Sequence, residues 1–145
     1  MDVRIEYLKH EDLEAYKRMI DGVLGESVPL DVYALNYDAF HPSVKVVVAK
    51  LGEEIVGTIT FVLIDTFTSP LDPRIEFSNF ATTVAARGTR AATDLMDFVT
   101  DYAIEYGYQS ITVNCLKDAE RAHNFYEKMG FERLDTVRFR KKISE

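Results

Sequence analysis

The chain has 145 residues, of which 47% are hydrophobic and 12% aromatic, and its formal net charge is −7. A chain of this length can bury about two thirds of its unfolded surface around one core, and its composition excludes an intrinsically disordered protein. The negative charge makes nucleic acid, which is a polyanion, an unfavourable partner. We therefore expect one domain that spans residues 1–145.

The apolar runs and the cysteine content bear on the cellular compartment. The longest apolar run, Ile55 to Ile64, is shorter than the roughly 20 residues of a membrane span, and Gly57 interrupts it. The N-terminal residues lack the apolar core of a signal peptide, and the single cysteine, Cys115, has no intrachain disulfide partner. These features predict a cytoplasmic protein that makes no membrane contact.

The first half of the chain predicts a strand, two helices and a hairpin. Val3 to Leu8 is strand-like, and Asp12 to Val23 carries an apolar face at helical spacing. A less regular helical piece follows near Val32 to Phe40, between two prolines. Two runs with many β-branched residues, Lys45 to Leu51 and Glu54 to Ile64, then flank a short glycine turn, which is the pattern of a β-hairpin.

The second half predicts a strand, a long helix, a further strand, a short helix and two final strands. Ile75 to Val84 and Ile111 to Leu116 are strand-like. Between them, apolar residues recur at the spacing of an amphipathic helix. The residues of this stripe are Ala91, Leu95, Phe98, Tyr102 and Tyr106. A strand, helix, strand unit implies a crossover that places the two strands parallel in a mostly antiparallel sheet.

The turn from Arg87 to Ala92 joins the strand-like run to the long helix and is the most informative segment. The first amides of a helix have no intrahelical acceptor, and the helix dipole is positive at that end. A phosphate would therefore gain both hydrogen bonds and a favourable field there. Arg87 and Arg90 add positive charge. The sequence predicts a pyrophosphate-binding turn, in which Arg90 either reaches a phosphate or points to solvent.

A second motif begins at Arg121 and ends with Gly130-Phe131, and its short helix carries Phe125-Tyr126. Together with the turn, this motif resembles the GNAT family of acetyl-CoA-dependent N-acetyltransferases, whose pyrophosphate loop and A-x-x-F-Y-x-x-x-G-F helix have the same order and spacing. The resemblance covers nearly the whole chain. It implies an α/β (α+β) GNAT-like acyl-CoA N-acyltransferase fold, with a central mixed, mostly antiparallel sheet of about seven strands flanked by about four helices.

The resemblance implies acetyl-CoA as co-substrate, and the three histidines show no metal-ligand spacing. The implied cofactor-binding residues are Thr82 and Val84 through their main chain, the turn residues Arg87, Gly88, Thr89, Arg90, Ala91 and Ala92, and Tyr126. Two positions depart from the family pattern. Arg90 stands where the family has glycine, which lets phosphate oxygens approach the backbone, and Ala119 stands where many members have asparagine.

Acetyl transfer to an amine requires a neutral amine, a polarised thioester carbonyl and a proton for the departing thiolate. Tyr126 resembles the family tyrosine that supplies this proton; the alternative is a core tyrosine. Glu76 lies eleven residues before Arg87, which resembles the placement of the catalytic glutamate in histone-acetyltransferase members. Apolar neighbours would raise its pKa and suit it to act as the base, unless it is solvated or paired with Arg74. His123 is a second candidate base.

Two further segments have simpler interpretations. We expect Cys115 to be a small buried side chain in a strand rather than a nucleophile, because no paired base is evident. We interpret the cationic segment from Arg138 to Lys142 as an edge strand. Its charged side chains alternate with Phe139 and point outward, which discourages the addition of a further strand.

The resemblance predicts an N-acetyltransferase that acts on a primary amine of a small molecule or a protein by direct attack. A non-catalytic GNAT-like module that binds CoA or a protein partner, and an unrelated α/β binding protein, are the alternatives. A homodimer is compatible with the resemblance. In the family the acceptor is bound by the first helices and by loops. Five residues there either line a cleft for a cationic amine or, in the preferred reading, cover the core. These residues are Asp31, Tyr33, Tyr37, Asp38 and Asp65.

Overall fold

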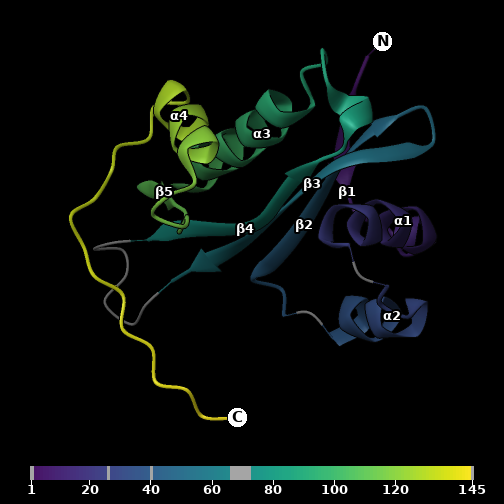
Figure 1. Cartoon of the computed structure of the whole chain (residues 1–145), viewed down its shortest axis with the longest axis horizontal. Coiled ribbons are helices and arrows are strands. Elements are labelled where there is room, and N and C mark those ends of the chain that lie inside the picture. Colours follow the sequence, from purple (N-terminus) through teal and green to yellow (C-terminus); the bar gives the residue numbers. More distant parts are fainter. Residues whose placement is uncertain (1, 26, 40, 66–72, 145) are drawn as a thin grey trace. The chain divides into compact units, whose positions relative to one another are not determined.

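The computed structural model describes all residues except 1, 26, 40, 66–72 and 145 (Figure 1). The chain forms two compact units, Met1–Val113 and Asn114–Glu145. Within the described ranges, every helix is too short or too polar to cross a membrane.

The N-terminal unit is built on a sheet of five strands in the order β1-β2-β3-β4-β5 (Figure 1). The strands are β1 (Arg4–Tyr7), β2 (Val44–Leu51), β3 (Glu54–Ile64), β4 (Arg74–Thr82) and β5 (Ser110–Thr112). The first four strands pair antiparallel, and β5 pairs parallel to β4. The predicted hairpin of β2 and β3 and the predicted parallel pair are therefore confirmed.

Helices cover both faces of this sheet. They are α1 (Leu13–Leu24), α2 (Leu30–Ala39) and α3 (Ala91–Tyr106), with short 3-10 turns η1 (His10–Asp12) and η2 (Val84–Ala86). Figure 1 shows α3 on one face and α1 on the other. On the α1 face, Tyr16 and Ile20 pack with Val48 and Ile55 of the sheet. On the α3 face, helix and strand rings meet, with 5.3 Å between the centroids of Phe61 and Tyr102.

The buried stripe of α3 differs from the predicted one. The buried residues are Ala91, Leu95, Met96, Val99 and Ala103. Tyr106 of the predicted stripe is 60% exposed. The helix rests on the sheet through small and aliphatic residues because the contact is close: a Cβ added at Gly57 would lie 3.1 Å from Leu95 Cδ1. The ring of Phe98 lies beside this contact and packs against the ring of Tyr7.

The C-terminal unit contains α4 (Glu120–Lys128), as predicted. The two predicted final strands are wrong, because none of the described residues 131–144 belongs to a strand. The sheet therefore has five strands rather than about seven. The predicted strand from Ile111 to Leu116 is formed only as far as Thr112, and Cys115 is exposed rather than buried. A strand-like sequence pattern does not by itself form a strand, because each strand needs a neighbouring strand that accepts its backbone hydrogen bonds.

Candidate functional site

β4 and β5 separate after a short ladder. They share three pairs, which join Arg74–Glu76 to Ser110–Thr112. β4 then continues as far as Thr82, whereas β5 ends. The last six residues of β4 thus extend beyond its parallel neighbour.

A β-bulge interrupts β4 in this region. Thr58 of β3 pairs with Ala81, but Thr60 pairs with Ser78, so the register shifts between them. Asn79 adopts a positive φ of 50°, and it is the one non-glycine residue to do so in the described part of the chain. Bulges re-aim the backbone and are enriched near functional sites. Sequence reasoning missed this feature, although Asn is the residue type that tolerates such a φ and the polar Ser-Asn pair was its signal.

The predicted phosphate turn follows β4 after the short 3-10 turn η2. η2 leads into Gly88, whose φ of 77° is in the left-handed region, and then into the start of α3. The turn is closed from within: Thr89 N donates to Ala86 O over 3.0 Å, and Ala91 N donates to Thr89 Oγ1 over 3.2 Å. These bonds fix the direction in which the first amides of the helix point.

Two amides of the first turn of α3 have no acceptor. Ala92 N and Thr93 N make no hydrogen bond to any residue that the structure describes. In the same region, Thr83 Oγ1 is buried and has no hydrogen-bond partner among the described residues. In other proteins, the free backbone amides at the start of a helix bind anions. The donor groups at this end of α3 therefore fit a phosphate.

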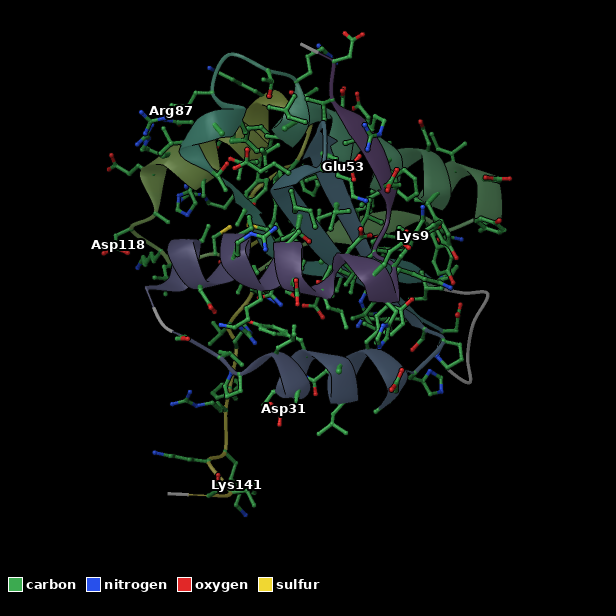
Figure 2. All side chains as sticks on the ribbon, turned by 90° about the vertical axis from the view of Figure 1, so that its right-hand side faces the viewer. Lys9, Asp31, Glu53, Arg87, Asp118 and Lys141 are labelled. Atoms are coloured by element: carbon green, nitrogen blue, oxygen red, sulfur yellow. The ribbon has the colours of Figure 1, made fainter. Side chains whose placement is uncertain are left out.

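The two arginines of the turn differ in their surroundings. Arg87 is exposed and has no ion pair within the described ranges, and Figure 2 shows it projecting away from the ribbon. Arg90 is held along the helix, because its Nε lies 3.2 Å from Asp94 Oδ1 and its second guanidinium nitrogen lies 3.7 Å from Asp97 Oδ2. The helix carboxylates thus compete with any phosphate for Arg90, and Arg87 is the freer cation.

Glu76 lies where the two parallel strands part. It forms the last pair of the β4–β5 ladder with Thr112 and pairs with Val62 on its other side. Ile75 and Phe77 are buried, whereas Glu76 between them is half-buried and so lies on the opposite face of the sheet. The structure therefore places Glu76 on the same strand as Thr82, ahead of the phosphate turn.

Tyr126 belongs to α4 in the C-terminal unit. Its ring centroid lies 5.7 Å from that of Phe125 and 5.6 Å from that of Phe131. Burial, with a smaller effect from the thiol of Cys115, raises the pKa of Tyr126 to about 12. The phenol is therefore protonated at neutral pH and is able to donate a hydrogen bond or a proton.

The competing candidates for catalytic roles are less well placed. Arg133 donates to His123 Nδ1 over 3.0 Å, and His123 Nε2 lies 2.9 Å from Leu116 O, which assigns the proton to Nε2. Both ring nitrogens are thus occupied, which disfavours His123 as a base. Desolvation raises the pKa of the Cys115 thiol, which opposes formation of a thiolate nucleophile. No group of metal-ligating side chains is found in the part of the chain that the structure describes.

Comparison with known proteins decides the family. The acetyltransferase (GNAT) family model matches residues 7–131. The chain belongs to this family. No curated protein matches it.

Solved structures resemble this acetyltransferase over almost its whole length. A transcriptional regulator from Bacillus halodurans C-125 is 25% identical with a TM-score of 0.80, covering 97% of this chain and 100% of that chain. An aminoglycoside acetyltransferase, meta-AAC0020, from an uncultured soil metagenomic sample in complex with sisomicin is 21% identical with a TM-score of 0.81, covering 98% and 97%. A ribosomal-protein-alanine N-acetyltransferase from Brucella melitensis biovar Abortus 2308 is 18% identical with a TM-score of 0.79, covering 99% and 100%. These likenesses confirm the GNAT-like fold.

In this acetyltransferase the residues expected near an acceptor mostly pack against the protein. The ring of Tyr33 lies 5.8 Å from Tyr16, and that of Tyr37 lies 5.6 Å from His10. Asp65 accepts a hydrogen bond from the Tyr108 hydroxyl over 3.1 Å. Asp31 and Asp38 are exposed on α2. Tyr33 packs against the core cluster, as the preferred interpretation expects, whereas Tyr37 and its partner His10 are both exposed. Most of the expected loop at 66–73 lies outside the described residues.

Proposed function

We propose that this acetyltransferase uses acetyl-CoA and transfers its acetyl group to a primary amine of a small molecule or a protein by direct attack. The carrying observation is the start of α3, where two amides have no acceptor and Arg87 has no ion pair among the residues that the structure describes. The family model runs through both compact units, which supports one catalytic domain over residues 1–145. We place this domain in the cytoplasm.

The geometry of the turn indicates which residues would bind acetyl-CoA. The amides of Ala92 and Thr93 and the guanidinium of Arg87 would hold the pyrophosphate of acetyl-CoA. The main chain of Thr82, the last residue of β4, and of Val84, the first residue of η2, would bind the pantetheine arm. When bound, acetyl-CoA supplies an activated thioester carbonyl.

Two residues of the chain, Glu76 and Tyr126, would then carry out the proton transfers. Glu76, half-buried at the point where β4 and β5 part, would take a proton from the acceptor ammonium, directly or through a water, so that the neutral amine becomes the nucleophile. Tyr126, protonated at neutral pH, would donate a proton or hydrogen bond to the departing thiolate sulfur. The related structures include an aminoglycoside acetyltransferase and a ribosomal-protein-alanine N-acetyltransferase, so small-molecule and protein amines are both proposed acceptors.

The proposal is tested first by binding. Titration calorimetry with acetyl-CoA should give saturable heat, and a ligand at about 100 times its dissociation constant should add about 2.7 kcal/mol to the unfolding free energy. Arg87→Ala should weaken this binding at least tenfold, whereas Arg18→Ala, which removes the same charge from an exposed position on α1, should leave it unchanged. Equal affinity for both variants would contradict the phosphate role of the turn.

The second test is turnover. Release of free CoA, followed with a thiol reagent, should depend on an amine from a panel that includes aminoglycosides and N-terminal peptides. The alternative is a non-catalytic GNAT-like module that binds CoA or a protein partner, and it is kept open by Arg90 at the position where the family has glycine. Binding of acetyl-CoA without amine-dependent turnover would support a CoA-binding module, and absence of binding would exclude the transferase.

A further inference from the structure

Tyrosine side chains gather at the C-terminal end of α3, away from the phosphate turn. α3 has 16 residues, so Tyr106 lies about 22 Å along the helix axis from Ala91. We define four tyrosines as the tyrosine patch: Tyr7 of β1, Tyr102 and Tyr106 of α3, and Tyr108, which follows α3. The proposed acetyl transfer makes no use of them.

The rings of the tyrosine patch pack on one another and on α3. Tyr102 is central: its ring centroid lies 4.5 Å from that of Tyr106 and 6.4 Å from that of Tyr108, with the ring planes tilted by 40° and 31°. Tyr7 packs edge-on against Phe98, with 5.3 Å between the centroids. Phe98 lies four residues before Tyr102 and so on the same side of the helix. The rings therefore form one aromatic surface.

Part of this aromatic surface is open to solvent. Tyr7 is 44% exposed and Tyr106 is 60% exposed. Tyrosine rings that are held by other rings lose little conformational freedom when a partner covers them, and tyrosine is enriched among the anchor residues of protein interfaces. The tyrosine patch therefore has the composition of a docking surface.

A row of carboxylates runs along α3 towards the tyrosine patch. Asp94, Asp97, Asp101 and Glu105 follow one another at intervals of three or four residues, which places them side by side on the helix. Arg90 forms ion pairs with the first two. Asp101 and Glu105 are exposed, and neither has an ion pair with any residue that the structure describes. The row thus ends in two carboxylates that lack a cation.

The end of this row belongs to the tyrosine patch. Burial raises the pKa of Tyr7, and the nearby Glu105 raises it further. The pKa of Tyr102 is raised in the same way, with a contribution from Asp65 as well. Lys45 of β2 lies on this side of the sheet, but it forms no ion pair within the described ranges. The patch is therefore both aromatic and negatively charged.

This combination fits an arginine side chain of a partner protein. A guanidinium is planar, stacks on an aromatic face and donates paired hydrogen bonds to a carboxylate, whereas a lysine ammonium is a compact and strongly hydrated charge. A second copy of the patch would bring like charges together. Residues 1–113 contain 18 acidic and nine basic side chains, a net charge of −9, which favours the approach of a basic partner.

We propose that the tyrosine patch docks an arginine-bearing basic segment of a partner protein, with a guanidinium stacked on the tyrosine rings and paired with Glu105. The segment would do at the end of the carboxylate row what Arg90 does at its beginning. The inference is independent of the proposed acetyl-CoA chemistry, because the patch lies at the other end of α3 from the phosphate turn.

The test uses the full-length protein and labelled peptides in which glycine alternates with arginine or with lysine. Fluorescence anisotropy should show saturable binding of the arginine peptide, and binding of the lysine peptide should be about tenfold weaker although its charge is the same. Amide chemical shifts should change most at Tyr7, Tyr102 and Tyr106 when the arginine peptide is added.

Two pairs of variants locate the binding. Tyr106→Ala should weaken binding of the arginine peptide about tenfold, whereas Tyr106→Phe, which keeps the ring, should bind as the wild type does. Glu105→Gln should weaken binding about threefold. Its control is Glu53→Gln, which removes the same charge from an exposed position in the turn between β2 and β3 and should leave the affinity unchanged.

Each of four results would overturn the proposal. Absence of binding would exclude the docking site. Equal affinity for the two peptides, with equal losses in Glu105→Gln and Glu53→Gln, would show that net charge alone attracts them. Unchanged binding in Tyr106→Ala would place the peptide on another surface. A dimer in light scattering that Tyr106→Ala dissociates would show that the patch joins two copies of this chain.

Discussion

Replacement of the buried Lys50 by methionine provides a quantitative test of how the scaffold is held together. Lys50 is 6% exposed, and its Nζ lies 2.6 Å from Glu6 Oε1 and 2.8 Å from Asp12 Oδ1. It thereby joins β2 to β1 and to η1, just ahead of α1. Lys50→Met keeps the length of the side chain but leaves two carboxylates without their shared cation.

The expected loss of stability follows from this geometry. Removing one partner of a buried ion pair costs about 3–5 kcal/mol because the other charge is left uncompensated. We expect the lower end, about 3 kcal/mol, because the Glu6 side chain is 27% exposed and can rehydrate. Unfolding entropy for a chain of this size is about 0.3 kcal/mol/K, so the melting temperature should fall by about 10 °C.

The loss should depend on pH. Desolvation raises the pKa of Asp12, but hydrogen bonds from Lys50 Nζ and Lys9 N outweigh it and hold the pKa below 3.8. The hydrogen bond from Lys50 holds the pKa of Glu6 below 4.5. A carboxyl whose folded pKa is lowered stabilises the protein fully above its unfolded pKa and loses that contribution as the pH falls. The difference between wild type and Lys50→Met should therefore be largest at neutral pH and shrink as the pH falls and the two carboxyls become protonated.

The assay is urea unfolding followed by circular dichroism at pH 7 and at pH 3. The control is Lys45→Met, which removes a half-buried lysine from the same strand and should change stability by less than about 1 kcal/mol. If both variants unfolded at the same urea concentration, the reasoning would be refuted. A loss that stayed the same at pH 3 would show that packing, and not the ion pairs, stabilises this corner.

Three further predictions concern the candidate site. Tyr126→Phe should lower the turnover number about 100-fold with an unchanged acetyl-CoA affinity by calorimetry, and full activity would assign the ring to packing. Glu76→Gln should remove the acidic limb of the kcat/KM profile against pH, and a limb that persists would assign the base to another group. Arg90→Gly should tighten acetyl-CoA binding about three- to tenfold and change the unfolding free energy by less than about 1 kcal/mol, because the Arg90–Asp94 pair is exposed.

The parts of the fold that depend on local pattern could be predicted from the sequence. The alternating runs around Gly52 predict β2 and β3 to within one residue at each end. The helix stripe after Arg87 predicts the crossover and the parallel β4–β5 pair, because a strand, helix, strand unit has few other solutions. The position of the turn at the start of α3 could be predicted for the same reason, because the turn joins two elements. Its phosphate-binding role, which follows from the chemistry of any helix start, stays a prediction.

The parts that depend on distant partners could not be predicted. The bulge at Asn79 depends on the register of β4 against β3, which single-strand patterns do not contain. The buried side of α3 includes Met96 and Val99 rather than Tyr106, which is 60% exposed, and the periodicity of the helix does not contain the sheet surface that selects them. The two predicted final strands do not form within the described residues 131–144. Alternation in the sequence indicates which side chains share a face, but not which neighbouring backbone accepts the hydrogen bonds of the strand.

The arginine at position 90 is the strongest departure from the family pattern, and its cost to phosphate binding is steric rather than conformational. As N-cap of α3 it has φ −93° and ψ 17°, which any residue can adopt, so arginine introduces no left-handed strain. Its guanidinium is held by Asp94 and Asp97, which leaves the turn's attraction for a phosphate to Arg87 and the helix amides. The Cβ of Arg90 is then the only group of this residue that opposes a close approach of the phosphate to the backbone. Arg90→Ala, which keeps the Cβ, should not reproduce the gain expected of Arg90→Gly; weaker binding in both variants would instead show that the guanidinium leaves its carboxylates for the phosphate.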